Sequence, residues 1–252
     1  RGSYVLDSML SRSPYSNINF FFKIERNTLD KPFSPNKGLI VKSTLKYVPW
    51  GGGEIGVYHN VVDPSTQEIT YNYSTLKPEF SAYGKLHLQF EQFIPLHKIF
   101  ILHYRWDAGL MFISHGLNGR AFDYARQDAF YLGGVDTRER ERAEDYIPFW
   151  GNKEGYVQSY NFSSLSVEAQ IIPLKDVYII PRISVLVNDE GNSTVYGNDA
   201  IYINQFDNNI DWSWSGGLAI AYNSIIGPIK ASISKASNTN SWEFYVALGY
   251  RF

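Results

Sequence analysis

The sequence predicts an all-β protein: an antiparallel transmembrane β-barrel, or the carboxyl-terminal part of one, with a long loop inserted into its lumen. Residues 241–252 alternate apolar with polar or small side chains and end on an aromatic. Polar side chains occupy the opposite face of most such segments, and short and long connections alternate along the chain. An outer-membrane barrel meets lipid outside and water inside, so its strands show this alternation over about ten residues.

The composition favours strands over helices. Of the 252 residues, 16% are aromatic, with 19 Tyr, 16 Phe and 6 Trp, types that suit strands and membrane interfaces. No run approaches the roughly 18 consecutive apolar residues that a membrane helix needs. The net charge of −2 does not favour nucleic acid as a partner. The absence of Cys excludes disulfides and thiolate metal sites.

Four predicted strands precede residue 114. In residues 17–26, apolar side chains occupy every second position, at Ile18, Phe20, Phe22 and Ile24. The same spacing recurs at Leu39, Val41, Leu45 and Tyr47, at Leu86, Leu88 and Phe90, and at Phe100, Leu102, Tyr104, Trp106, Ala108 and Leu110.

Five more predicted strands follow residue 155. Four of them cover residues 164–171, 177–185, 212–222 and 229–233, each with polar or small side chains between the apolar ones. The last is the terminal strand, with one face made of Trp242, Phe244, Val246, Leu248, Tyr250 and Phe252. Trp212 and Trp214, with Trp50, fit interfacial anchors at the outer rim, and they also fit plain packing at strand ends.

The connections alternate in length as they do in outer-membrane barrels, which have tight periplasmic turns and longer outer loops. Short connections are expected at 29–36, 95–98, 173–176, 224–228 and 237–240, and long ones at 50–79, 114–155 and 188–210. About nine strands result, whereas single-chain bacterial barrels normally have an even number. Either a further strand lies within residues 1–15 or 54–73, or the amino-terminal part of the barrel is missing. We therefore treat 1–252 as one barrel domain, the carboxyl-terminal portion of a larger barrel, with an inserted loop at 114–155.

The polarity of the second face distinguishes this prediction from a soluble sandwich or lipocalin-like barrel, whose interior would be apolar. The second face carries Lys23, Glu25, Glu91, His103, Arg105, Asp107, Glu168, Arg182, Lys230 and Arg251. Among these, His103, Arg105, Asp107, Glu168 and Arg182 are the candidate lumen residues. The triplet on residues 103–107 could pair with the inserted loop, line an ion path, or simply face lumen water.

Four passages resemble the carboxyl-terminal half of the bacterial surface antigen superfamily, which includes barrel-assembly subunits, two-partner secretion transporters and barrels fused to patatin-like phospholipases. They are Phe33-Ser34-Pro35-Asn36-Lys37-Gly38, Phe130-Tyr131-Leu132-Gly133-Gly134, Ile226-Gly227-Pro228-Ile229 and Gly249-Tyr250-Arg251-Phe252. The first looks like the family's Pro-x-x-Gly turn, and the second like the start of the long loop that folds into the lumen. The last two look like its final turn and final strand, and the resemblance implies five strands after the loop.

One departure concerns the inserted loop. Most members carry Arg-Gly-Phe or Arg-Gly-Tyr there, but in this chain Arg138 and Arg140 are followed by Glu. The loop continues to Asp145-Tyr146-Ile147-Pro148-Phe149-Trp150-Gly151, which is similar to a passage of patatin-fused barrels. The resemblance thus implies the patatin-fused branch and gives as loop residues Leu132, Gly133, Gly134, Arg138, Arg140, Pro148, Phe149, Trp150 and Gly151.

No catalytic constellation is visible, so we predict no enzyme activity, catalytic residue, metal site or cofactor for this chain. The patatin nucleophile needs Gly-x-Ser-x-Gly, which does not occur, and the 5 His lack metal-ligand spacing. The prediction is an outer-membrane barrel, in contact with outer-membrane lipids, that anchors, displays or translocates an attached lipid hydrolase domain. The rivals are an insertase or secretion pore with periplasmic domains, a passive porin and a soluble lipid-binding barrel. The sequence leaves open whether two barrels pair.

Overall fold

The computed structural model describes residues 4–10, 15–31, 34–53, 55–62, 69–76, 82–113, 128–134, 146–153, 157–189, 194–197, 200–203, 210–224 and 227–248. These residues form strands joined by turns, and none of their segments is a helix long and apolar enough to cross a membrane. Arg138, Arg140, Tyr250 and Phe252, four of the residues singled out from the sequence, lie outside the described residues.

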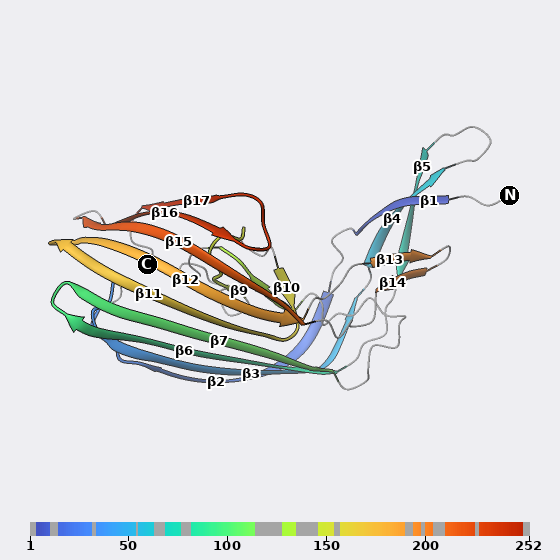
Figure 1. Cartoon of the computed structure of the whole chain (residues 1–252). Helices are drawn as coiled ribbons and strands as arrows, with labels where there is room; N and C mark the ends of the chain where they lie inside the picture. Colours follow the sequence, from blue (N-terminus) through green and yellow to red (C-terminus); the bar gives the residue numbers. More distant parts are fainter. Residues whose placement is uncertain are drawn as a thin grey trace.

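A nine-stranded antiparallel sheet dominates the molecule (Figure 1). Its strands are β2 (Tyr15–Asn27), β3 (Gly38–Gly53), β6 (Tyr83–His97), β7 (Phe100–Ile113), β11 (Phe162–Leu174), β12 (Val177–Asp189), β15 (Ile210–Ser224), β16 (Gly227–Ala236) and β17 (Glu243–Leu248). Neighbouring strands in this order pair with each other, so the sheet is a simple meander. Eight of the nine segments expected from the alternation lie within one of these strands, and the terminal segment expected at 241–252 is a strand over 243–248, with 249–252 outside the described residues. The all-β antiparallel prediction is confirmed.

The connections differ at the two ends of the sheet. Short turns join β2 to β3, β6 to β7, β11 to β12 and β15 to β16. At the other end, three connections carry further strands (Figure 1). These are β4 (Ile55–Val62) and β5 (Ile69–Leu76); β8 (Phe130–Leu132), β9 (Tyr146–Ile147) and β10 (Val157–Ser159); and β13 (Thr194–Gly197) and β14 (Ala200–Ile203). We assign the short-turn end to the periplasm, because outer-membrane barrels place their short turns there.

Strands do occur in both stretches proposed to hide one, but they do not extend the large sheet. β1 (Tyr4–Leu10) pairs with β4, and β4 with β5, in a separate three-stranded sheet. The large sheet therefore keeps an odd number of strands, and among the described residues no pairing joins β2 to β17.

The two faces of the large sheet differ as the alternation predicts. The outward face is apolar and exposed: Trp212 is 66% exposed, Ile183 67% and Phe244 73%. Exposed apolar surface on this scale is unfavourable in water and is what a barrel presents to lipid. The concave face is polar and largely buried, and β8–β10 lie against it (Figure 1).

Candidate functional site

The predicted lumen residues form one polar cluster on the concave face, because the strand register brings them side by side. Alternate residues of a strand point to the same face, and antiparallel partners face each other. His103 of β7 pairs with Glu168 of β11, which pairs with Arg182 of β12. Glu91 of β6 pairs with Arg105 of β7 in the same way. All five of these side chains are buried.

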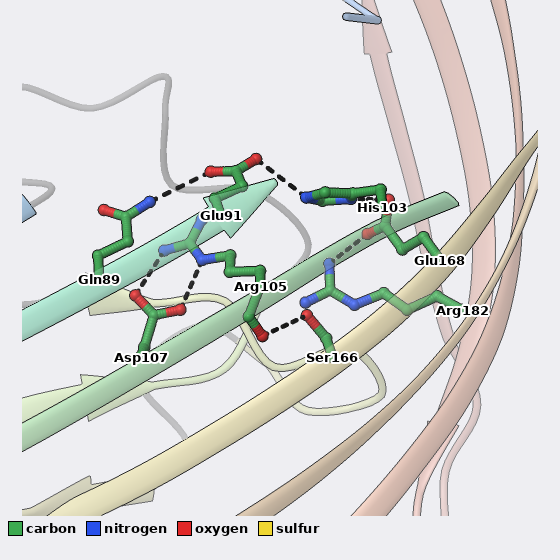
Figure 2. A network of polar contacts seen from close by, with 8 residues as sticks. All are labelled: Gln89, Glu91, His103, Arg105, Asp107, Ser166, Glu168 and Arg182. Carbon is green, nitrogen blue, oxygen red and sulfur yellow. Dashed lines mark hydrogen bonds and ion pairs between the residues drawn. The ribbon is translucent and has the colours of Figure 1, made fainter. Parts of the chain in front are cut away.

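His103 lies at the centre of this cluster (Figure 2). Its Nδ1 is 2.8 Å from Glu168 Oε2, and its Nε2 is 3.1 Å from Glu91 Oε1. The imidazole also stacks on Phe93, with ring centroids 4.0 Å apart and planes 2° from parallel. Arg182 Nη1 donates to Glu168 Oε1 at 2.8 Å, so that one carboxylate serves an imidazole and a guanidinium.

A second buried ion pair, between Arg105 and Asp107, lies beside the contacts of His103 (Figure 2). Arg105 Nε and Nη2 donate to the two carboxylate oxygens of Asp107 at 2.5 and 3.0 Å. His87 Nε2 lies 3.4 Å from Asp107 Oδ1, and Gln89 donates to Glu91 at 3.2 Å. Each buried carboxylate in this cluster therefore has an arginine or histidine nitrogen beside it, and such pairing is the condition under which burial of ionisable groups is tolerated.

The described parts of the segment between β7 and β11, residues 128–134 and 146–153, pack against this concave face of the large sheet, called the wall below. β8 pairs with β10 antiparallel and with β9 parallel. Gly133 N–H donates to Ile147 C=O and Gly134 N–H to Asn152 C=O, both at 2.9 Å. The side chains that this segment buries almost completely are Phe130, Leu132, Ile147, Phe149 and Trp150. Together with residues of the wall, these side chains form two apolar clusters.

One end of the segment is anchored by Asp128. Its carboxylate lies 2.5 Å from Lys46 Nζ of β3 and accepts from Tyr83 Oη of β6 at 2.7 Å. Its carbonyl accepts from Lys85 Nζ at 2.5 Å, and the Lys85 ammonium lies 4.2 Å from the Phe130 ring centroid. These contacts fix the start of the segment on two neighbouring wall strands.

Trp150 and Gly151 hold the other end of the segment against the wall. A Cβ at Gly217 of β15 would lie 2.8 Å from Trp150 Cε3, so only the absence of a side chain there makes room for the indole. Arg182 Cζ and Lys230 Nζ lie 5.0 and 5.2 Å from the Trp150 ring centroid, within cation–π range. Gly151 has φ +87°, and its Cβ would lie 2.3 Å from the Lys235 backbone, so the chain passes directly against β16.

The structure thus brings most of the candidate residues together. The lumen residues at 103, 105, 107, 168 and 182 share one buried network, and Leu132, Gly133, Gly134, Pro148, Phe149, Trp150 and Gly151 lie in the segment packed over it. The side chains of His103, Arg105 and Asp107 pair with other side chains of the large sheet. Arg182 contacts a loop side chain, that of Trp150. Trp242, Phe244, Val246 and Leu248 are exposed on the outward face.

Sequence reasoning missed Asp128 as an anchor and did not single out Glu91 and His87. Glu91 could have been found by counting outward from the turn at 95–98, since that turn sets the partner of Arg105. Asp128 carries no comparable indication, because its partners come from strands far away in sequence. Among the described residues, no group of His, Asp and Glu side chains has the arrangement of a metal site.

Comparison with known proteins gives one family match. The model of the Omp85 superfamily domain matches residues 3–252. No curated protein matches the chain. Among solved structures, the chain is similar to the crystal structure of BamA from Haemophilus ducreyi lacking POTRA domains 1-3, with 10% identity and a TM-score of 0.41. That similarity covers 93% of this chain, which spans 62% of the BamA chain.

Proposed function

The chain belongs to the Omp85 superfamily of outer-membrane barrels, and from that premise we propose that it is a plugged barrel that anchors, displays or translocates an attached polypeptide domain. We propose further that the attached domain is a patatin-like lipid hydrolase carried by a longer protein. The barrel itself then acts as a membrane anchor and passage and performs no chemistry.

The observation that carries the proposal of a plugged barrel is the seating of residues 128–134 and 146–153 on the polar wall. Phe149 and Trp150 are 0% and 1% exposed, and Gly151 passes against the backbone of β16. A passive porin needs a water-filled lumen bounded by polar side chains. Here the polar side chains that would line that path are covered and pair with one another, which supports a closed resting state.

The hydrolase part of the proposal rests on sequence resemblance. Residues 145–151 are similar to the loop of patatin-fused barrels, and the described part of this passage makes the wall contacts of Ile147, Phe149, Trp150 and Gly151. A lipid hydrolase tethered to an outer-membrane barrel would act on lipids close to its anchor.

The intact mass and peptide map of the protein extracted from native membranes test the hydrolase proposal. The expected result is a mass well above 28.9 kDa, the mass of these 252 residues, together with a Gly-x-Ser-x-Gly peptide from the additional part. A larger protein without such a peptide would overturn the hydrolase proposal and leave the anchor proposal to be tested by conductance.

A second candidate, an insertase or secretion pore, is favoured by the family and by the edges of the sheet. Among the described residues, β2 and β17 each have a partner on one side only. A strand edge with free backbone groups can pair with another strand. This candidate predicts periplasmic domains in place of the hydrolase, and cross-links between β17 and unfolded barrel proteins in native membranes.

A further inference from the structure

The outward face of β15–β17 carries one lysine within an apolar surface. Lys235 pairs with Gly216 across β15 and β16, so the two residues point to the same side of the sheet. Ser234 and Ala236, its neighbours in the chain, are buried on the concave side, whereas Lys235 is exposed. Its position is next to the turn between β16 and β17, at the end of the long connections.

Three tryptophans gather at this end. Trp212, Trp214 and Trp242 are 66%, 55% and 56% exposed. The Lys235 ammonium lies 5.8 Å from the ring centroid of Trp242. The backbone of Trp214 is tied to the turn, because its N–H donates to Ser237 Oγ at 3.0 Å and its C=O accepts from Ser237 N–H at 2.8 Å. Exposed Trp at strand ends is typical of the headgroup level of a membrane.

Gly216 leaves the sheet surface beside the lysine without a side chain. A Cβ at Gly216 would have no neighbour closer than 4.0 Å, so the outward surface is open above it. Its partner on β12 is Ile183, which is 67% exposed. Leu218, two residues along β15, is 43% exposed. This open stretch of surface therefore lies between apolar side chains and beside a cation.

The charge of Lys235 needs an anion at this depth. None of the ion pairs among the described residues involves Lys235, and an unpaired cation next to hydrocarbon is unfavourable. A long lysine side chain can lift its ammonium to the headgroup level, where lipid phosphates are. Because the long connections face outward in outer-membrane barrels, those phosphates belong to the outer leaflet.

We propose that Lys235, Trp214, Trp242 and the open surface above Gly216 form a binding site for the phosphate headgroup of an outer-leaflet lipid, with an acyl chain of that lipid lying between Ile183 and Leu218. The ammonium contacts the phosphate, and the indole rings of the two tryptophans flank the headgroup. This site does not depend on what the barrel anchors or transports, so it goes beyond the proposed function.

Lipid retention by the full chain tests the site. Wild type and Lys235→Gln are placed in phosphatidylethanolamine nanodiscs containing a small fraction of diphosphoryl lipid A or the same lipid without its phosphates. Bound lipid is then counted by native mass spectrometry. The expected result is about fivefold less phosphorylated lipid on Lys235→Gln, because one lysine near a charged membrane surface contributes about 1 kcal/mol. The matched control is Lys175→Gln, which removes an exposed lysine from a turn at the opposite end of the sheet and should retain lipid as wild type does.

Gly216→Leu tests the acyl position separately, since its side chain would occupy the open surface above residue 216 without changing the charge. It should lower retention of the phosphorylated lipid relative to wild type. Equal retention by wild type and Lys235→Gln would overturn the proposal, because it would mean that Lys235 only contacts Trp242. Equal retention of the phosphorylated and dephosphorylated lipids by wild type would overturn it as well.

Discussion

Removal of the Trp150 side chain should undock the segment that covers the wall. The indole is 1% exposed, occupies the space above Gly217 and lies within about 5 Å of two cations. Truncation of a buried Trp to Ala costs about 3–5 kcal/mol, and loss of the cation–π contacts adds to this. Since each 1.4 kcal/mol is a factor of ten, the undocked population should rise by about two to four orders of magnitude.

Conductance across a planar bilayer measures this change. Trp150→Ala should show frequent, long openings where the wild type stays near baseline. The matched control is Trp214→Ala, which removes the same side chain from the outward face of β15, where it is 55% exposed. Wild-type behaviour of Trp150→Ala, in a variant shown to fold and insert, would refute the argument that this indole holds the segment on the wall.

Three further predictions concern the same structure. Glu168→Gln removes the carboxylate shared by a buried imidazole and a guanidinium, so it should lower the free energy of unfolding in urea by about 3–5 kcal/mol. The control Glu25→Gln, which breaks a partly exposed ion pair, should lower it by less than about 1 kcal/mol. Equal losses for the two variants would contradict the account. Gly151→Ala should make residues 146–153 more protease-sensitive than in the wild type, because its Cβ would lie 2.3 Å from a backbone carbon at φ +87°. An unchanged digestion pattern there would count against that clash. Asp128→Asn removes the ion pair with Lys46, a partly buried contact that contributes about 1 kcal/mol. Hydrogen exchange of the amides in residues 128–134 should therefore become about fivefold faster. Unchanged exchange rates would show that this ion pair does not anchor the segment.

The strands and their faces could be predicted from the sequence because alternation is a local property. Phe244 and Val246 follow the outward spacing of the terminal strand, and both are exposed. The polar residues at 103, 105 and 107 follow the opposite spacing and are buried on the concave side. No knowledge of the partner strand is needed to place a side chain on one face or the other.

The contacts across strands could not be predicted in the same way. Glu168 meets both His103 and Arg182 only because the register of β7, β11 and β12 aligns them, and register depends on the whole sheet. The position of Trp150 above Gly217 depends on a long connection returning to a distant strand. A further barrel strand was expected within residues 1–15 or 54–73, but the strands found there, β1, β4 and β5, pair with one another in a separate sheet.

Fluorescence quenching of single-tryptophan variants tests the central claim most directly, namely that the outward face meets lipid while residues 128–134 and 146–153 are packed against the wall. The protein is placed in bilayers of brominated lipid and, separately, exposed to aqueous iodide. The account predicts strong quenching of Trp214 by brominated lipid and protection of Trp150 from both quenchers, in line with exposures of 55% and 1%. Quenching of Trp150 by either agent to the extent seen for Trp214 would contradict it.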